Sequence, residues 1–328
     1  MKNFKKSIQL LLIFIGFTIN LNCVDDSKSD VPNKNINEDG TILKSYVSDN
    51  GSAQIVHVFG AQGTRYDKIL KYDGSIGIQY VYNANNKMTE IIQSPDDTYP
   101  DKTLFTYDNS GKIVQMQFDN RSPGSTGTLK TWLFTYNGNE IIQELVSDID
   151  PNYNHDRIRY KFNTDGLLVS KHKYSDSPNN TYITTQYYQT FQYDNNKNII
   201  LRKATQNATH DLPDSPINNP QTEIITYEYD DKINPIHTVL MNHYLNHIFS
   251  FIPNFNVIQG NLQDRVLGAG KNNLTRSIAS FNPQLGTPID NDYKNVITYQ
   301  SNNLPSKLSR VSIVDNIEVS SVTISYDN

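Results

Sequence analysis

A complete β-hairpin is predicted by the stretch Phe105-Thr106-Tyr107-Asp108-Asn109-Ser110-Gly111-Lys112-Ile113. Its two aromatic residues are two positions apart, so in a strand they lie on the same face while the threonine between them points to the other. The aspartate favours a turn by accepting hydrogen bonds from nearby backbone, and the glycine tolerates the positive φ that such a turn needs. The chain then returns into apolar residues, which form the second strand.

The same pattern recurs along the chain: an aromatic residue, any residue, a second aromatic residue, and then Asp or Asn. The second aromatic residues are Tyr82, Tyr107, Tyr136, Phe162, Tyr193 and Tyr229, and weaker copies end in Tyr299 and Tyr326. A lone hairpin is marginal in water, so successive hairpins must bury their aromatic faces together. With further strands expected at 41–48, 53–59 and 64–72, the predicted fold is all-β: an antiparallel meander of repeated hairpins forming a closed or nearly closed soluble barrel.

Composition narrows the class of protein. The chain has 328 residues, 21 tyrosines, 19% charged residues and a net charge of −5. It has no basic block, which disfavours a nucleic-acid binder because such proteins displace phosphate counterions with a cationic surface. A barrel inserted in a membrane is also disfavoured, because the outward positions of the repeats carry Thr, Lys, Gln and Glu where lipid requires apolar side chains.

The N-terminus predicts export. Residues 1–22 combine three lysines with an apolar stretch that is too short and too interrupted to span a bilayer, which is typical of a signal peptide. Cys23, the only cysteine, follows directly and cannot form an internal disulfide. The segment resembles a bacterial lipoprotein signal, which implies that Cys23 is acylated, although Asn20 and Asn22 depart from the usual residues there. The alternative is an ordinary signal peptide beside an incidental cysteine.

Residues 23–40 are predicted to form a lipidated flexible tether, because this polar segment cannot bury a core. Its acidic cluster resembles a signal that sends some Gram-negative lipoproteins to the cell surface, and a merely solvated linker remains the alternative. Removing residues 1–22 takes away three lysines and changes the net charge from −5 to −8. Residues 41–328 are expected to be a single β-repeat domain with a long insert at about 235–293.

Two family resemblances follow from these features. The units 105–113, 160–168 and 191–199 resemble the tyrosine-aspartate repeats of Rhs-type proteins, although they lack the Gly-Arg that often follows the turn there. The whole arrangement over 41–328, with its lipoprotein start and with 227–235 opening the insert, resembles a family of uncharacterised Gram-negative lipoproteins. That family is described as a domain of unknown function with a porin-like fold. The resemblance implies a barrel and an outer-membrane location, and it implies no activity.

One loop is a candidate calcium site. It places oxygen ligands at every second position, in Asp148, Asp150, Asn152, Asn154 and Asp156. Calcium favours clustered carboxylate and amide oxygens, although this loop is not an EF-hand, because Tyr153 occupies the position of the required glycine. The alternative is a polar loop in an Asn-rich chain. No other cofactor is expected.

A second candidate site contains His237, His243 and His247, the last two of which would share one helical face. Zinc would need a third ligand and usually a nearby acid, so packed or exposed histidines are the favoured interpretation. No nucleophile elbow or phosphate loop is present. Paired carboxylates for glycoside hydrolysis are not identifiable from sequence, because their separation depends on the fold.

Three functions are therefore weighed. The first is a non-enzymatic lipoprotein, on the surface or facing the periplasm, whose rim loops bind a glycan or protein ligand. The second is a structural or assembly component of the envelope, and the third a glycan-acting hydrolase. Tyrosine suits binding surfaces because it offers stacking area and a hydroxyl at low entropic cost. Candidates outside the repeat positions are Tyr99, Tyr153, Tyr182 and Tyr244. A patch of exposed rings on the long-loop rim would favour binding.

Overall fold

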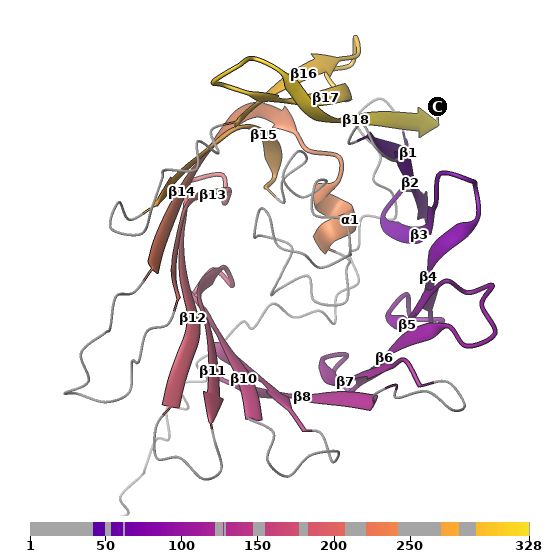
Figure 1. The fold of residues 1–328 in the computed structure, drawn as a ribbon, viewed down its shortest axis with the longest axis vertical. Helices are drawn as coiled ribbons and strands as arrows, with labels where there is room; N and C mark the ends of the chain where they lie inside the picture. Colours follow the sequence, from indigo (N-terminus) through magenta and orange to yellow (C-terminus); the bar gives the residue numbers. More distant parts are fainter. Residues whose placement is uncertain are drawn as a thin grey trace, which may run out of the picture.

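The computed structural model describes residues 42–49, 54–61, 63–121, 127, 129–146, 155–176, 183–206, 221–241, 270–281 and 293–327. Within them the chain is a ring of 18 β-strands with a short helix inside it (Figure 1). The elements are β1 (Ile42–Asp49), β2 (Gln54–Gly60), β3 (Arg65–Leu70), β4 (Ile76–Tyr82), β5 (Met88–Gln93), β6 (Asp101–Tyr107), β7 (Ile113–Asp119), β8 (Leu129–Asn137), β9 (Glu140–Leu145), β10 (His155–Phe162), β11 (Leu168–Asp176), β12 (Ile183–Tyr193), β13 (Ile199–Gln206), β14 (Gln221–Ile233), α1 (His237–Met241), β15 (Asn272–Phe281), β16 (Tyr293–Tyr299), β17 (Pro305–Ser312) and β18 (Glu318–Asp327).

The sheet closes on itself. Each strand pairs antiparallel with the next one in sequence, and β18 pairs with β1 in a register that places Tyr46 opposite Ile324. Closure gives every strand two neighbours and so removes the exposed edges of an open meander. The predicted all-β antiparallel meander and its closure are confirmed. The three strands expected before the first repeat are also present, as β1, β2 and β3.

The repeat turns have the predicted chemistry. The carboxylate of Asp108 accepts hydrogen bonds from the backbone N–H groups of Ser110 and Lys112, both at 2.9 Å. Gly111 donates its N–H to the Asp108 carbonyl and has a φ of 81°. Asn163 makes the same pair of bonds, to Asp165 and Leu167. A short polar side chain that mimics backbone therefore closes these hairpins.

The two aromatic residues of each repeat have different roles. The first is buried in the core, in Tyr80, Phe105, Phe134, Tyr160, Phe191 and Tyr227. In most repeats the second is a tyrosine whose hydroxyl donates to a carbonyl in the preceding hairpin, as Tyr107 does to Met88 at 2.6 Å and Tyr193 to Leu168 at 2.6 Å. The exceptions are Phe162, which has no hydroxyl, and Tyr299, which donates to the Asp230 carboxylate. Tyr82, Tyr136, Tyr229 and Tyr326 make equivalent bonds. The repeat tyrosine thus joins adjacent hairpins, which explains its recurrence before the turn.

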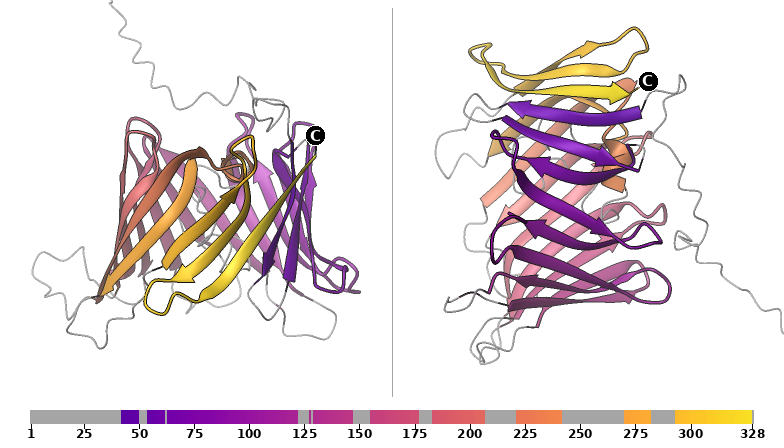
Figure 2. Two further views of the ribbon diagram at one scale, coloured as in Figure 1. Left: turned by 90° about the horizontal axis from the view of Figure 1, so that it is seen from above. Right: turned by 90° about the vertical axis from the view of Figure 1, so that its right-hand side faces the viewer.

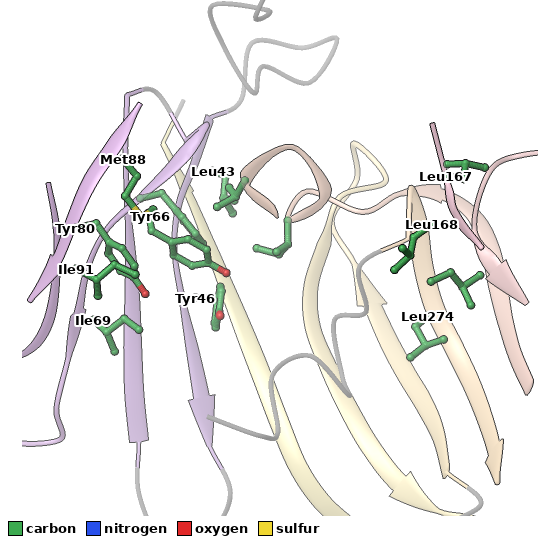
Figure 3. Close-up of a cluster of buried hydrophobic side chains, with 14 of the residues drawn as sticks. Leu43, Tyr46, Tyr66, Ile69, Tyr80, Met88, Ile91, Leu167, Leu168 and Leu274 are labelled. Carbon is green, nitrogen blue, oxygen red and sulfur yellow. The ribbon is translucent and has the colours of Figure 1, made fainter. Parts of the chain in front are cut away.

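The core lies on the inner face of the ring. One group of buried rings comes from β1 to β4, where Tyr46 stacks on His57 with ring centroids 4.3 Å apart and Tyr66 stacks on Tyr80 at 5.4 Å. Figure 3 shows Tyr46, Tyr66 and Tyr80 gathered together. Helix α1 contacts β3, and Ile236 just before the helix and Val239 within it are buried in the same core cluster. The helix therefore fills part of the interior.

The outer face of the ring is polar and charged. Ion pairs link neighbouring strands there, with Glu90 to Lys102 at 2.9 Å and Glu144 to Arg157 at 2.7 Å. Arg276 lies 3.6 Å from Glu228 across β14 and β15. These positions alternate with the buried residues of the same strands, which places them outside. The expected alternation of an aromatic inner face with a polar outer face is present.

The long insert expected at 235–293 requires a correction. The structure places a barrel strand, β15, within this interval, paired with β14 along most of its length and with β16 at Arg276 and Ser277. The sequence Asn272–Phe281 lacks the aromatic pair of the repeats, so the repeat pattern did not predict this strand. The chain leaves the sheet after β14 and rejoins it at β15, where Asn234 donates its backbone N–H to the Lys271 carbonyl.

A polar network holds the two ends of this connection together. The Asp230 carboxylate accepts hydrogen bonds from the Tyr299 hydroxyl and from the backbone and side-chain nitrogens of Asn273. Asn198 bonds Asn272 through both side-chain atoms, at 2.9 and 3.1 Å. Asn234 donates its side-chain N–H to the Gly270 carbonyl at 3.0 Å. The asparagines of this network are buried, so the connection begins and ends at one fixed point of the wall.

Candidate functional site

The two rims of the barrel differ. The short turns that follow the second aromatic residue of each repeat, such as 108–112 and 163–167, lie at one end, which we call the short-turn rim. The C-terminal end of β18 and the start of β1 lie at that same rim, where Lys44 pairs with Asp327 at 2.9 Å. The turn between β17 and β18 lies at the opposite end, which we call the long-connection rim (Figure 2, left). The chain therefore enters the barrel at the short-turn rim.

Exposed large apolar side chains gather on the long-connection rim. Tyr72, in the turn between β3 and β4, is 82% exposed, and Tyr99, between β5 and β6, is 55% exposed. Four more lie at the tip of the β17–β18 hairpin: Ile313, Val314, Ile317 and Val319. The remaining exposed ones are scattered in Leu104, Leu133, Ile200, Ile233 and Val296. Grouped exposed apolar side chains on a soluble surface usually mark an interaction site.

Of the exposed apolar side chains on this rim, Tyr99 alone was predicted by residue from the sequence. The sequence analysis also stated that exposed tyrosine rings on this rim would favour binding. Tyr153, Tyr182 and Tyr244 lie outside the described residues. The apolar hairpin tip was missed, although its signal is visible: Asp315 and Asn316 mark a turn, and the residues around them are aliphatic where polar residues are usual. Tyr72 was missed because it lies in an expected strand, 64–72, whereas the structure ends that strand at Leu70.

The predicted metal sites lie largely outside the described residues. Asp148, Asp150, Asn152 and Asn154 fall outside them, and of the fifth candidate ligand, Asp156, only the backbone is described, in β10. His237 begins α1, while His243 and His247 are again outside. Within the ranges given above, no group of three or more His, Cys, Asp or Glu side chains could hold a metal ion. The calcium site stays a prediction.

A second candidate is a polar cluster on the inner wall, from β9 to β13. Lys171 lies opposite Tyr160 on one side and Gln189 on the other, with its amine 5.8 Å from the Tyr160 ring centroid. The Tyr160 hydroxyl donates to Gln143 at 2.8 Å. Arg202, on β13, is also buried. Sequence analysis missed this cluster. The alternation of residues between the two faces of a strand is shifted by a β-bulge, so the sequence does not show which polar side chains point inward.

The cluster has an unusual electrostatic state. Burial, followed by the charges of Lys173 and Arg202, lowers the pKa of Lys171 to about 7. A lysine with such a pKa can act as a base or a nucleophile, provided that a substrate reaches it. Lys171 is only 6% exposed, so the described geometry offers its amine little access to solvent. The rim, which is exposed, is therefore the stronger candidate for recognition.

None of the helices that the structure describes is long and apolar enough to cross a bilayer.

Comparisons with known proteins find similarity in solved structures alone. No protein-family model matches the sequence, and no curated protein matches it. A crystal structure of a porin-like protein from Bacteroides vulgatus has 14% sequence identity and a TM-score of 0.42, with 88% of this chain and 99% of that chain covered. A crystal structure of a porin-like protein from Bacteroides uniformis has 10% identity and a TM-score of 0.29, with 87% and 98% covered.

Proposed function

We propose that this chain is a lipid-anchored, non-enzymatic binding protein of the bacterial outer membrane, whose long-connection rim binds a glycan or protein ligand. The observation that carries the proposal is the grouping of exposed apolar side chains on that rim, with Tyr72 and Tyr99 among them. Exposed tyrosines are frequent in binding surfaces because the ring packs while the hydroxyl bonds. The scaffold beneath them is a closed ring of hairpins, and a rigid scaffold of this kind can hold binding loops whose sequences vary.

The place where the chain enters the barrel supports this arrangement. The chain enters β1 at the short-turn rim, so an acyl group on Cys23 would anchor the barrel by that side. The long-connection rim would then face away from the membrane. The ion pairs on the outer face support an aqueous environment around the barrel, because charged side chains on a lipid-facing wall cost about 2–4 kcal/mol each near the bilayer midplane.

A structural role in the envelope is the second candidate. The observation that favours it is the use of the repeat tyrosines inside the fold, where their hydroxyls are committed to backbone carbonyls such as those of Met88 and Ile113. Such tyrosines contribute nothing to a binding surface. A purely structural role does not explain the exposed apolar side chains on the long-connection rim.

We expect Cys23 to carry acyl chains and to be the first residue of the mature protein. Its thiol would otherwise be the single unpaired thiol of an exported protein. Mass spectrometry of protein purified from bacterial membranes measures the N-terminal peptide directly. A Cys23→Ser variant should appear in the soluble fraction. An unmodified Cys23, or cleavage at another residue, would show that the anchor is wrong.

We expect the double variant Tyr72→Ser, Tyr99→Ser to lose about tenfold or more in affinity for any probe that the native chain binds on a glycan array, because buried interface tyrosines often contribute more than 1 kcal/mol each. Leu133→Ser is the matched control, since Leu133 is 41% exposed on the outer wall. A native chain that binds no glycan would leave a protein ligand or the structural role, and equal affinities of the double variant and the Leu133→Ser variant would contradict a binding role for the two tyrosines.

A further inference from the structure

The tip of the β17–β18 hairpin, residues 313–319, is an ordered apolar protrusion, which we call the apolar tip. Four of its side chains are aliphatic and exposed, with Val314 at 69% and Ile317 at 58%. Single exposed aliphatic residues are ordinary on protein surfaces, but four within one hairpin turn form a contiguous patch. Leaving them in water costs free energy that a partner surface would recover.

Hydrogen bonds hold the apolar tip in one shape. Ser312 donates its backbone N–H to the Ile317 carbonyl at 3.0 Å, and Ile317 donates its own N–H to the Asp315 carboxylate at 3.3 Å. A hydrogen bond from the Ser312 side chain lowers the pKa of Asp315, so this carboxylate is ionised at neutral pH. The turn is thus preorganised, which reduces the ordering entropy that binding would otherwise cost.

Acidic residues lie at the apolar tip and in the turns next to it. The tip itself carries Asp315 and Glu318, and all seven of its residues are exposed. The next described turns along the rim, which follow β3 and β5, expose Asp73, Asp96 and Asp97 beside Tyr72 and Tyr99. Lys71 is the one cation within these turns as far as the structure describes them, and Lys307 on β17 pairs with Glu318 at 3.5 Å. This sector therefore combines apolar side chains with a strong excess of carboxylates.

Charge decides which partner fits. A second copy of this chain would present the same acidic sector or an acidic chain, of net charge −8 after residue 22, and like charges repel across an interface. An anionic membrane surface is disfavoured for the same reason. A partner with Lys or Arg side chains around an apolar depression satisfies both features at once, since complementary charge raises the association rate and excludes wrong partners.

We propose that the apolar tip and the acidic turns beside it form a docking surface for a positively charged protein segment with apolar side chains. This inference rests on the proposed function, because it assigns a class of partner to the same rim. Val314 and Ile317 supply the buried contacts, while the carboxylates of Asp96, Asp97 and Asp315 orient the partner and make binding sensitive to salt.

The test uses the mature chain and a phage-displayed library of random short peptides. Selected peptides are expected to be enriched in Lys and Arg together with aliphatic residues. Their affinity should fall about tenfold or more for Val314→Ser, Ile317→Ser, and should also fall for Asp96→Lys, Asp97→Lys, which leaves the tip intact. Val296→Ser is the matched control, because Val296 is 51% exposed on the outer face of β16.

Four outcomes would overturn the proposal: no peptide is selected, the selected peptides lack basic residues, the tip variant binds them as tightly as the native chain, or phosphatidylcholine vesicles bind through Val314 and Ile317. The rim tyrosines separate this result from the proposed function. If tip variants behave like the native chain while the Tyr72 and Tyr99 variant loses glycan binding, the partner class is wrong and the binding function stands.

Discussion

Replacing Lys171 by methionine is expected to stabilise the folded protein at neutral and acidic pH, with a gain that shrinks as the pH rises. Lys171 is 6% exposed, and burial together with Lys173 and Arg202 lowers its pKa from 10.5 to about 7. Below about pH 7 the amine is charged in both the folded and the unfolded chain, so the whole cost of burying the charge is present. Methionine removes that charge at similar length.

The pH dependence follows from proton binding. Between about pH 7 and pH 10 the folded chain holds a neutral amine while the unfolded chain still holds an ammonium group, so the native protein becomes more stable as the pH rises. Each pKa unit corresponds to about 1.4 kcal/mol, which gives a change of up to about 4 kcal/mol over the window. The variant lacks this contribution, so its advantage over the native chain declines accordingly.

Urea unfolding of both chains at about pH 6 and about pH 9 measures this difference. Only the change with pH in the difference between the two unfolding free energies is diagnostic. The loss of the other contacts of Lys171 shifts this difference by an amount that does not depend on pH. Lys161→Met is the matched control, since it removes a solvent-exposed lysine from the neighbouring strand β10. A difference between native and Lys171→Met stabilities that stays constant across the window would contradict the buried, uncharged state of this amine.

Replacing Asp230 by alanine is expected to destabilise the protein by about 3 kcal/mol. The carboxylate accepts hydrogen bonds from Tyr299, from two nitrogens of Asn273 and from the backbone of Lys232. Removing it leaves donors in a partly buried site without their acceptor, among them the buried Asn273, which costs more than the bonds themselves contribute. Asp231→Ala is the control one residue away, because Asp231 has a 94% exposed side chain and lies 3.8 Å from Lys232.

A spectroscopic readout separates this effect from a general loss of packing. Burial, and then the hydrogen bond to Asp230, raise the pKa of the Tyr299 phenol. In Asp230→Ala the second cause disappears, so we expect one tyrosine to titrate at lower pH in an absorbance titration, provided that the variant stays folded. Equal stabilities of the Asp230 and Asp231 variants would show that the network does not fix the connection between β14 and β15.

The repeat is the part of the fold that sequence reasoning predicted well. The positions of the aromatic pair, the Asp or Asn turn and the returning apolar strand are local features, so 105–113 contains nearly all the information needed for its own hairpin. The strand β15 was missed, because it has no aromatic pair and its pairing partner β14 lies beyond a long connection. Local patterns do not record such non-local pairing.

The candidate site was predicted less well. Tyr99 was identified because it stands outside the repeat positions, whereas Tyr72 and the tip residue Val314 were not. Lys171 could not be identified at all. A β-bulge between Lys161 and Phe162 shifts the register so that Lys171 lies opposite Tyr160, and the alternation that assigns side chains to the two faces is interrupted at that point.

The amino-acid sequence by itself determined that the chain is an all-β meander of hairpins, because aromatic pairs, turn residues and alternation act over a few neighbouring positions. Only the tertiary structure decided how many strands make the ring, that β18 closes on β1, and which side chains share a rim or the interior. These depend on contacts between residues far apart in sequence. The turn of Val314 lies near those of Tyr72 and Tyr99 along the rim because the ring closes between β18 and β1.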